Sequence, residues 1–262
     1  MAGVAGRVAL VTGAGSAGGI GFAVARLLRE AGAHVGITST TDRIFTRLEE
    51  LPGAADKAFA GTADLTDSVQ VEKLVADLTA SLGPVEILVN NAGMVQTGSD
   101  DESMLLHEIS DEQWRYGLDI NLTTAFMVTR AVLLGMIERG YGRIVQMSSV
   151  TGPVVSNPKA TIYGAAKAGM LGMTRALAIE VAKNNITVNS IGPGWSETPS
   201  SSPEEVFAGK NTPAGRPGTA DEIGHVAVFL ASEEASYLTG QLIVVDGGNT
   251  IQEYKGPAEG YY

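Results

Sequence analysis

The stretch that decides the fold runs from Arg7 to Gly21 and reads RVALVTGAGSAGGIG. Its first part, Arg7 to Thr12, has the apolar centre of a strand that is buried on both faces of a parallel sheet. Glycines follow, and the pattern predicts a helix from about Ile20 to Gly32. The bare amides and the dipole at the N-terminus of that helix suit a pyrophosphate. A strand, a glycine turn and a helix in this order predict a dinucleotide-binding βαβ unit.

Strands and helices alternate along the rest of the chain. The further predicted strands are residues 34–39, 57–61, 85–90, 144–147, 186–191 and 241–246. Thr66 is expected to cap the helix that follows the third strand and ends at Leu82. This alternation predicts one parallel sheet of seven strands, covered by helices on both faces and joined by right-handed crossovers. We therefore expect a single doubly wound α/β domain of the Rossmann type over residues 1–262, with no second domain.

Composition excludes several classes of function. The chain has 262 residues and a net charge of -11, which disfavours nucleic acid as a partner. It has no cysteine, and its three histidines are scattered, so we expect no thiol chemistry, disulfide or metal site. We see neither a signal peptide nor a membrane span, and therefore expect a cytoplasmic protein. The acidic run Asp100 to Glu102 is expected to be solvated.

A second stretch carries the candidate chemistry. The apolar run Ile144 to Met147 leads into Ser148 and Ser149, and a helix is expected from Ala160 to Ala182. Tyr163 and Lys167 are four residues apart and share one face of that helix. An ammonium group near a phenol lowers the phenol pKa, so the tyrosine could exchange a proton with a substrate oxygen. Alone, however, the Tyr–Lys spacing is as typical of an ordinary helix surface as of a catalytic site.

One long helix is expected over residues 111–138, with Asn121 inside it. Asparagine is locally unfavourable in a helix interior. Because apolar residues surround Asn121, a functional role is a plausible alternative to an ordinary surface position.

In these motifs the sequence resembles the short-chain dehydrogenase/reductases in their single-domain form, from about Gly6 to Gly248. Asn121, Ser149, Tyr163 and Lys167 match the catalytic tetrad of that family. The resemblance implies that Tyr163 is the general acid and base and that Ser149 binds the substrate oxygen. It also implies that Lys167 holds the nicotinamide ribose and that Asn121 positions a water linked to Lys167.

The same resemblance implies a nicotinamide cofactor and a set of contacts to it. The implied cofactor-binding residues are Gly13, Ser16, Gly19, Ile20, Gly21, Ser39, Thr40, Thr41, Asp64, Leu65, Asn91, Ala92, Gly93, Tyr163, Lys167, Pro193, Gly194 and Thr198. Asp64 corresponds to the adenine contact, and Pro193, Gly194 and Thr198 to the segment that closes over the nicotinamide.

Two features depart from the family pattern or leave a choice open. Five residues separate Gly13 from Gly19, which is longer than the usual spacing and is similar to the enoyl reductases of the same superfamily. Those enzymes place more residues between tyrosine and lysine, so the close pair favours carbonyl reduction. Ser149 matches the catalytic serine better, and Ser148 is the reserve assignment.

The predicted function is hydride transfer between a nicotinamide cofactor and a ketone or secondary alcohol. NADP(H) is the expected cofactor, because Ser39 stands where NAD-binding relatives carry an acid, although NAD(H) is possible. Arg43 could add charge near a 2′-phosphate if it turns inward, and Asp42 is expected to be a helix N-cap. Alternatives are a cofactor-binding protein without turnover and an enoyl reductase; an extended epimerase or dehydratase would need a longer chain.

The sequence does not identify the substrate. A flap is expected over about residues 194–217, which are rich in Ser, Pro and Gly. Candidate pocket residues are Met94, Val95, Val154, Val155, Trp195 and the flap from Ser196, each equally explained by core packing. The partner is expected to be a small carbonyl or alcohol compound. The long apolar helices and the family resemblance predict a homotetramer, and the tail 249–262 could reach a neighbouring subunit.

Overall fold

The computed structural model describes residues 2–93 and 104–256. Seven parallel strands form one sheet in the order β3-β2-β1-β4-β5-β6-β9. The strands are β1 (Val8–Thr12), β2 (His34–Ser39), β3 (Ala58–Thr62), β4 (Ile87–Asn90), β5 (Gly142–Met147), β6 (Ile186–Pro193) and β9 (Leu242–Val245). The predicted seven-stranded, doubly wound sheet is confirmed.

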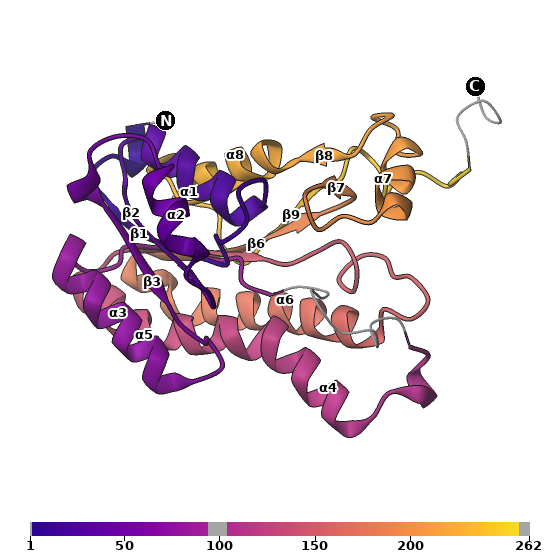
Figure 1. Ribbon diagram of the computed structural model, residues 1–262, viewed down its shortest axis with the longest axis horizontal. Coiled ribbons are helices and arrows are strands. Elements are labelled where there is room, and N and C mark those ends of the chain that lie inside the picture. The colour runs from indigo at the N-terminus through magenta and orange to yellow at the C-terminus, as the bar shows by residue number, and fades with distance from the viewer. Residues whose placement is uncertain (1, 94–103, 257–262) are drawn as a thin grey trace.

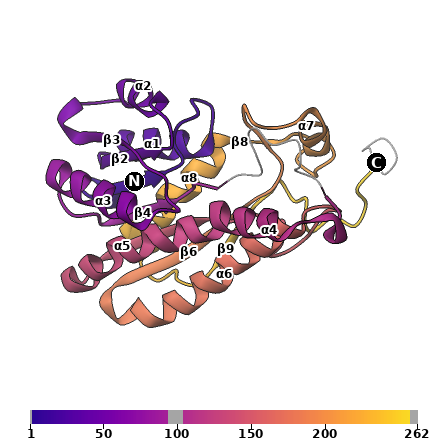
Figure 2. The same ribbon diagram turned by 60° about the horizontal axis from the view of Figure 1, so that its bottom comes forward.

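Helices cover both faces of this sheet (Figure 1). One layer contains α1 (Ile20–Glu30), α2 (Arg43–Glu49) and α8 (Ala220–Leu230). The other contains α3 (Ser68–Leu82), α5 (Thr124–Arg139) and α6 (Thr161–Val181). Figure 2 shows α5 and α6 running side by side below the sheet.

The strand β1 shows why the sheet must be covered twice. Ala9 and Val11 pack into the core under α1 and α8, whereas Val8 and Leu10 pack into the core under α3 and α5. Successive side chains of a strand point to opposite faces, so a continuous apolar run fills two cores at once. The strand order also reverses at β1, which has β2 on one side and β4 on the other. Ligands of open α/β sheets bind beyond the carboxyl ends of the strands at such a reversal.

The predicted single helix over 111–138 is wrong in one detail. It consists of α4 (Asp111–Leu118), a π-helical turn (Asp119–Thr123) and α5. Asn121 lies in the π turn and is buried. The whole stretch Asp111–Arg139 is long and apolar enough to cross a membrane by length and composition. In this fold α5 packs Val128, Val132 and Met136 into the core under the sheet, whereas Leu134 stays exposed.

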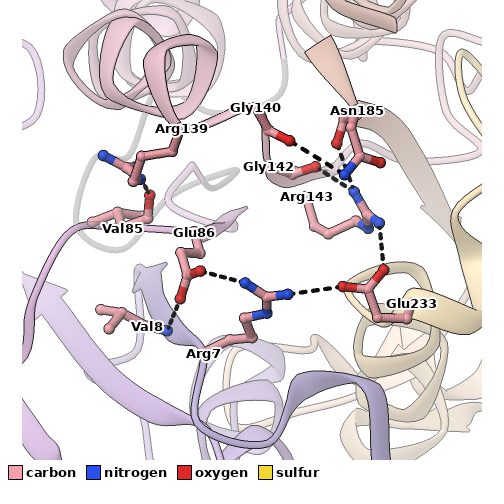
Figure 3. Close-up of polar contacts among 10 residues, drawn as sticks. All are labelled: Arg7, Val8, Val85, Glu86, Arg139, Gly140, Gly142, Arg143, Asn185 and Glu233. Carbon is pink, nitrogen blue, oxygen red and sulfur yellow. Dashed lines mark hydrogen bonds and ion pairs between the residues drawn. The ribbon is translucent and has the colours of Figure 1, made fainter. Parts of the chain in front are cut away.

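A cluster of charged side chains lies at the amino ends of the strands, opposite the carboxyl ends where a ligand is expected (Figure 3). Arg143 on β5 is fully buried and contacts Glu233 at 3.0 Å. Its guanidinium also donates to the carbonyl oxygens of Gly142, Asn185 and Ser232.

Arg7 extends this cluster to the neighbouring strands. Its guanidinium joins Glu86 at 2.6 Å, just before β4, and Glu233 at 3.1 Å. Arg7 and Arg143 both lie against the ring of Tyr141, at 3.8 and 4.5 Å from its centroid. Burial raises the pKa of Tyr141 to about 12, so this phenol stays neutral between the two guanidinium groups. The cluster ties β1, β4 and β5 to the segment after α8.

The segment expected to be a flap contains regular structure that composition did not predict. A two-stranded parallel pair joins β7 (Ser196–Glu197) to β8 (Gly218–Thr219) at its base. Between them lies α7 (Pro203–Lys210), which begins with a capping box formed by Ser202 and Glu205. The flap is therefore a small helical unit tied at both ends.

Candidate active site

The four tetrad residues come from three elements that meet beyond the carboxyl ends of the strands. Asn121 lies in the π turn, Ser149 follows β5, and Tyr163 and Lys167 lie in the first turns of α6. The helices pack closely: Gly117 of α4 contacts the side chain of Ile162 on α6.

Lys167 is held at the tip of β5. Its side chain is buried, and Nζ donates a 2.9 Å hydrogen bond to the carbonyl oxygen of Met147. The same Nζ lies 5.5 Å from the centroid of the Tyr163 ring. Burial disfavours the ammonium form and lowers the pKa of Lys167 to about 8. This residue therefore titrates near the physiological range, unlike an ordinary lysine.

The pKa of Tyr163 is raised, which corrects the prediction of a lowered value. The largest cause is burial, because removing the phenol from water disfavours its ionised form. A hydrogen bond with the side chain of Ser149 acts in the opposite direction, and the negative charge of Glu205 on α7 raises the pKa further. The cost of burying a phenolate thus outweighs the stabilising contact.

The two serines after β5 have different partners. Ser149 Oγ accepts a 3.0 Å hydrogen bond from the amide of Thr151 and also contacts the Tyr163 hydroxyl. Ser148 Oγ instead donates a 2.9 Å hydrogen bond to the carbonyl oxygen of Lys167 on α6. This geometry favours Ser149 over Ser148 as the group that meets a substrate oxygen.

Asn121 faces the loop after β4. Its Nδ2 donates to the carbonyl oxygen of Gly117 at 3.1 Å. Its Oδ1 lies against Gly93: a β-carbon on that glycine would be 3.1 Å from it. Gly93 has a φ of +130°, which a residue with a side chain rarely adopts. The π turn therefore brings Asn121 beside the strand-end motif that the family resemblance assigns to the cofactor.

Hydrogen bonds join this motif to the end of β1. Thr12 Oγ1 accepts from the amides of Asn91 and Ala92 at 3.0 and 2.9 Å. The side chain of Asn91 donates back to the carbonyl oxygens of Thr12 and Gly13. The two strand ends on either side of the topological reversal are thus fixed relative to one another.

The glycine loop leads into α1 as predicted. Gly13 has a φ of +68°, and a β-carbon there would lie 2.8 Å from the Cα of Ala92. Gly19 occupies the N-cap of α1 without a side-chain cap, and its amide donates to Ser16. Because no described side chain caps the first turn, its amides suit a pyrophosphate. The residues present therefore fit the diphosphate of a dinucleotide.

Arg43 lies over this loop, although its side chain stays exposed to solvent. A β-carbon on Gly15 would lie 2.5 Å from Arg43 Nε and 3.0 Å from the Cβ of Ser39. The Ser39 hydroxyl donates to the carbonyl oxygen of Thr41 at 2.8 Å. Asp42 occupies the N-cap position of α2, but its side chain makes no capping bond, contrary to our expectation. The end of β2 thus presents a serine and an arginine beside the glycine loop.

Other predicted cofactor positions also lie at or after the carboxyl ends of strands, beyond β3 and at the end of β6. Asp64 Oδ1 accepts from the amide and the hydroxyl of Thr66, at 2.9 and 2.7 Å, and Leu65 is buried. The cap of α3 is Asp67 and not the predicted Thr66. Pro193 ends β6, and Gly194 packs against Asp246.

In the flap, the amide of Thr198 donates a hydrogen bond to Ser201 Oγ, and its hydroxyl is also bonded to that oxygen. The candidate pocket residues Val154, Val155 and Trp195 lie outside the buried core. Met94, Val95 and Asp100 to Glu102 lie outside the described residues.

Comparison with known proteins decides the family. Residues 13–250 match the model of a family described as enoyl-(acyl carrier protein) reductase. The chain belongs to the short-chain dehydrogenase/reductase family. It is 39% identical to the oxidoreductase UcpA of Salmonella typhimurium, over 97% of this chain and 98% of that protein.

Two further relatives and a solved structure agree. The chain is 38% identical to the 3-oxoacyl-[acyl-carrier-protein] reductase FabG of Vibrio harveyi, covering 93% of this chain and 97% of that one. It is 41% identical to nodulation protein G of a Rhizobium species, covering 93% and 96%. The crystal structure of a putative gluconate dehydrogenase from Agrobacterium tumefaciens matches with a TM-score of 0.86 and 35% identity, over 95% of this chain and 97% of that one. This short-chain dehydrogenase/reductase is therefore an oxidoreductase.

Proposed function

We propose that this protein interconverts a ketone and a secondary alcohol, with NADPH as the preferred cofactor. The observation that carries the proposal is the contact of Ser149 with Tyr163 beside the buried Lys167. Two relatives, a 3-oxoacyl-[acyl-carrier-protein] reductase and a putative gluconate dehydrogenase, are named for redox chemistry at a carbonyl or an alcohol.

When bound, the nicotinamide supplies or accepts the hydride. In reduction, Ser149 donates a hydrogen bond to the carbonyl oxygen as negative charge develops there, and Tyr163 gives that oxygen its proton. Burial raises the pKa of Tyr163, so the phenol is protonated at neutral pH, as a proton donor must be. By family resemblance, Lys167 would hold the nicotinamide ribose and Asn121 a water linked to Lys167.

The choice of NADPH rests on the end of β2. NAD-binding sites of this kind place an acidic side chain there to accept from the ribose 2′-hydroxyl. In this chain Ser39 occupies the corresponding position, and Arg43 lies beside it against Gly15. A guanidinium group at this place attracts a phosphate and binds it with directed hydrogen bonds.

A second candidate is reduction of an enoyl thioester. The description of the matching family model names that activity, and the long glycine loop resembles such enzymes. The spacing of four residues between Tyr163 and Lys167 favours the ketone. A protein that binds nucleotide without turnover is the third candidate, and the complete tetrad argues against it.

The proposed assembly is a homotetramer. Leu134 on α5 and Ile179 on α6 expose 65% and 82% of their surface, on helices that we expect to pair across two-fold axes. Within the described part of the tail, Gln252 donates a hydrogen bond to the carbonyl oxygen of Asn211 in its own subunit. A tetrameric mass by light scattering at micromolar concentration is expected; a monomeric mass would refute this proposal.

The test of function uses the purified protein with a panel of ketones, secondary alcohols and enoyl thioesters. Each compound is combined with both nucleotides, and nicotinamide oxidation or reduction is followed by absorbance. We expect ketone-dependent oxidation of NADPH. Turnover of enoyl thioesters alone would favour the second candidate, and tight nucleotide binding without any turnover would favour the third.

A further inference from the structure

Lys167 is anchored twice to the same strand tip. Its Nζ donates to the carbonyl oxygen of Met147 at 2.9 Å, and its own carbonyl oxygen accepts from Ser148 Oγ at 2.9 Å. Two consecutive residues of the strand tip thus hold the two ends of one lysine. Both side chains, Ser148 and Lys167, are buried with 3% of their surface exposed.

The two bonds fix different degrees of freedom. The bond from Nζ selects one conformation of a long side chain that otherwise samples many rotamers. The bond from Ser148 fixes where the helix backbone sits relative to β5, because it grips the peptide group of Lys167 itself. A lysine held only at Nζ would keep its ammonium group in place while its helix turn, which also carries Tyr163, could still shift.

We propose that Ser148 is a positioning residue, which sets the Lys167 turn of α6 against β5 and thereby aligns Lys167 and Tyr163 with Ser149. The proposal rests on the proposed function of these three residues. Ser148 does not act on the substrate oxygen, since its hydroxyl is directed at the helix backbone. It acts by fixing the position of Lys167.

A matched control lies on the same helix. Ser190 of β6 contacts Thr174 Oγ1 of α6 at 2.7 Å, and this pair is also buried. Ser190→Ala therefore removes a buried hydrogen bond between a strand and α6, about two helical turns beyond Lys167. A purely structural role of Ser148 predicts similar effects of Ser148→Ala and Ser190→Ala.

The decisive measurement is the titration of Lys167, followed by NMR in protein with labelled lysine. In the wild type the pKa lies at about 8 because of burial. Ser148→Ala loosens this turn and admits water to the ammonium, which favours the charged form and raises the titration midpoint. Ser190→Ala leaves the midpoint unchanged. Equal midpoints in Ser148→Ala and the wild type, or equal shifts in both variants, would overturn the proposal.

Kinetics give the second readout. In Ser148→Ala, kcat for ketone reduction falls about 10- to 100-fold, as small misplacements of catalytic groups do, with the KM for nucleotide nearly unchanged. Ser148→Cys, whose thiol is a weaker donor, shifts both readouts in the same direction and serves if the alanine variant does not fold. If the wild type reduces no ketone, the proposed function fails, and the lysine titration alone still decides the positioning role.

Discussion

Pro199 in the flap lies directly against Gly18 in the glycine loop. A β-carbon on Gly18 would be 2.9 Å from Cγ and 3.0 Å from Cδ of Pro199. Gly18 belongs to the part of the loop that is longer than the usual family spacing, and Pro199 follows Thr198, a predicted nicotinamide contact. The extended loop and the flap therefore touch where both are expected to meet the cofactor.

Gly18→Ala should raise the KM for nucleotide, because Pro199 must move away from the new methyl group. Crowding of this kind costs about 1.4 kcal/mol, which corresponds to about a tenfold change in affinity. Steady-state kinetics measure the change. In the double variant Gly18→Ala/Pro199→Ala the crowding is relieved, so KM should return toward the wild-type value. Additive effects of the two substitutions would show that this contact does not set the flap position.

Tyr163→Phe should lower kcat by about 100- to 10,000-fold, because the ring still packs but the proton donor is gone. The dissociation constant for NADPH, measured by fluorescence, should stay nearly unchanged. A variant that keeps most of the wild-type kcat would remove Tyr163 from the mechanism.

Glu205→Gln should lower the pKa of Tyr163, because the negative charge of Glu205 raises it. Alcohol oxidation needs ionised Tyr163 and rises with pH through this pKa, so its rising limb should move to lower pH. Ketone reduction needs protonated Tyr163, so its rate falls as pH rises through this pKa. In Glu205→Gln that fall should begin at a lower pH than in the wild type.

Glu204→Gln is the control for this prediction. Glu204 is the neighbouring acid on α7 and is not a cause of the Tyr163 shift. Equal pH profiles of Glu205→Gln and the wild type would contradict the predicted coupling between the flap helix and Tyr163.

Ser39→Asp should shift the nucleotide preference toward NADH, because a carboxylate would face the 2′-phosphate of NADPH. Arg43→Ala should weaken NADPH binding and leave NADH binding nearly unchanged. The ratio of kcat/KM for the two nucleotides measures both effects. A wild-type enzyme that already prefers NADH would show that the end of β2 has been misassigned.

Glu233→Ala should lower the free energy of unfolding by about 1.5–3 kcal/mol, because the buried Arg143 loses its charged partner. Denaturant unfolding measures the loss. Lys73→Ala, which breaks the exposed pair of Lys73 and Asp77, should cost less than about 1 kcal/mol. Since the Arg143 cluster lies at the amino ends of the strands, neither variant should change the pH profile.

The architecture and the shared helix face of Tyr163 and Lys167 could be predicted because their signals are local, whereas the full tetrad was assigned from the family resemblance. The apolar run of β1, the glycine turn and the helix spacing of Tyr163 and Lys167 each occupy a few consecutive residues. Two missed features also had local signals. Ser202, Pro203 and Glu205 form the start sequence of a capped helix, and composition rich in Ser, Pro and Gly obscured it. Asp67, next to Thr66, was an equally good cap by residue type.

The remaining features depend on contacts between distant segments. The direction of the Tyr163 pKa shift follows from burial, which no spacing reveals. The different partners of Ser148 and Ser149 depend on how α6 lies against β5. The position of Arg43 over the glycine loop depends on the space that Gly15 leaves. Patterns of consecutive residues do not reveal such contacts.

The π turn from Asp119 to Thr123 divides one continuous helix into two independent surfaces. One extra residue in a turn rotates everything beyond it by about 100° relative to an unbroken α-helix. The side of α4 that meets α6 is thus set separately from the side of α5 that fills the core. Substitutions in α4 can therefore change its packing against α6 while the buried residues Val128, Val132 and Met136 keep their places. Deletion of a single residue from the turn would couple the two surfaces again and carry Asn121 out of alignment with Gly93.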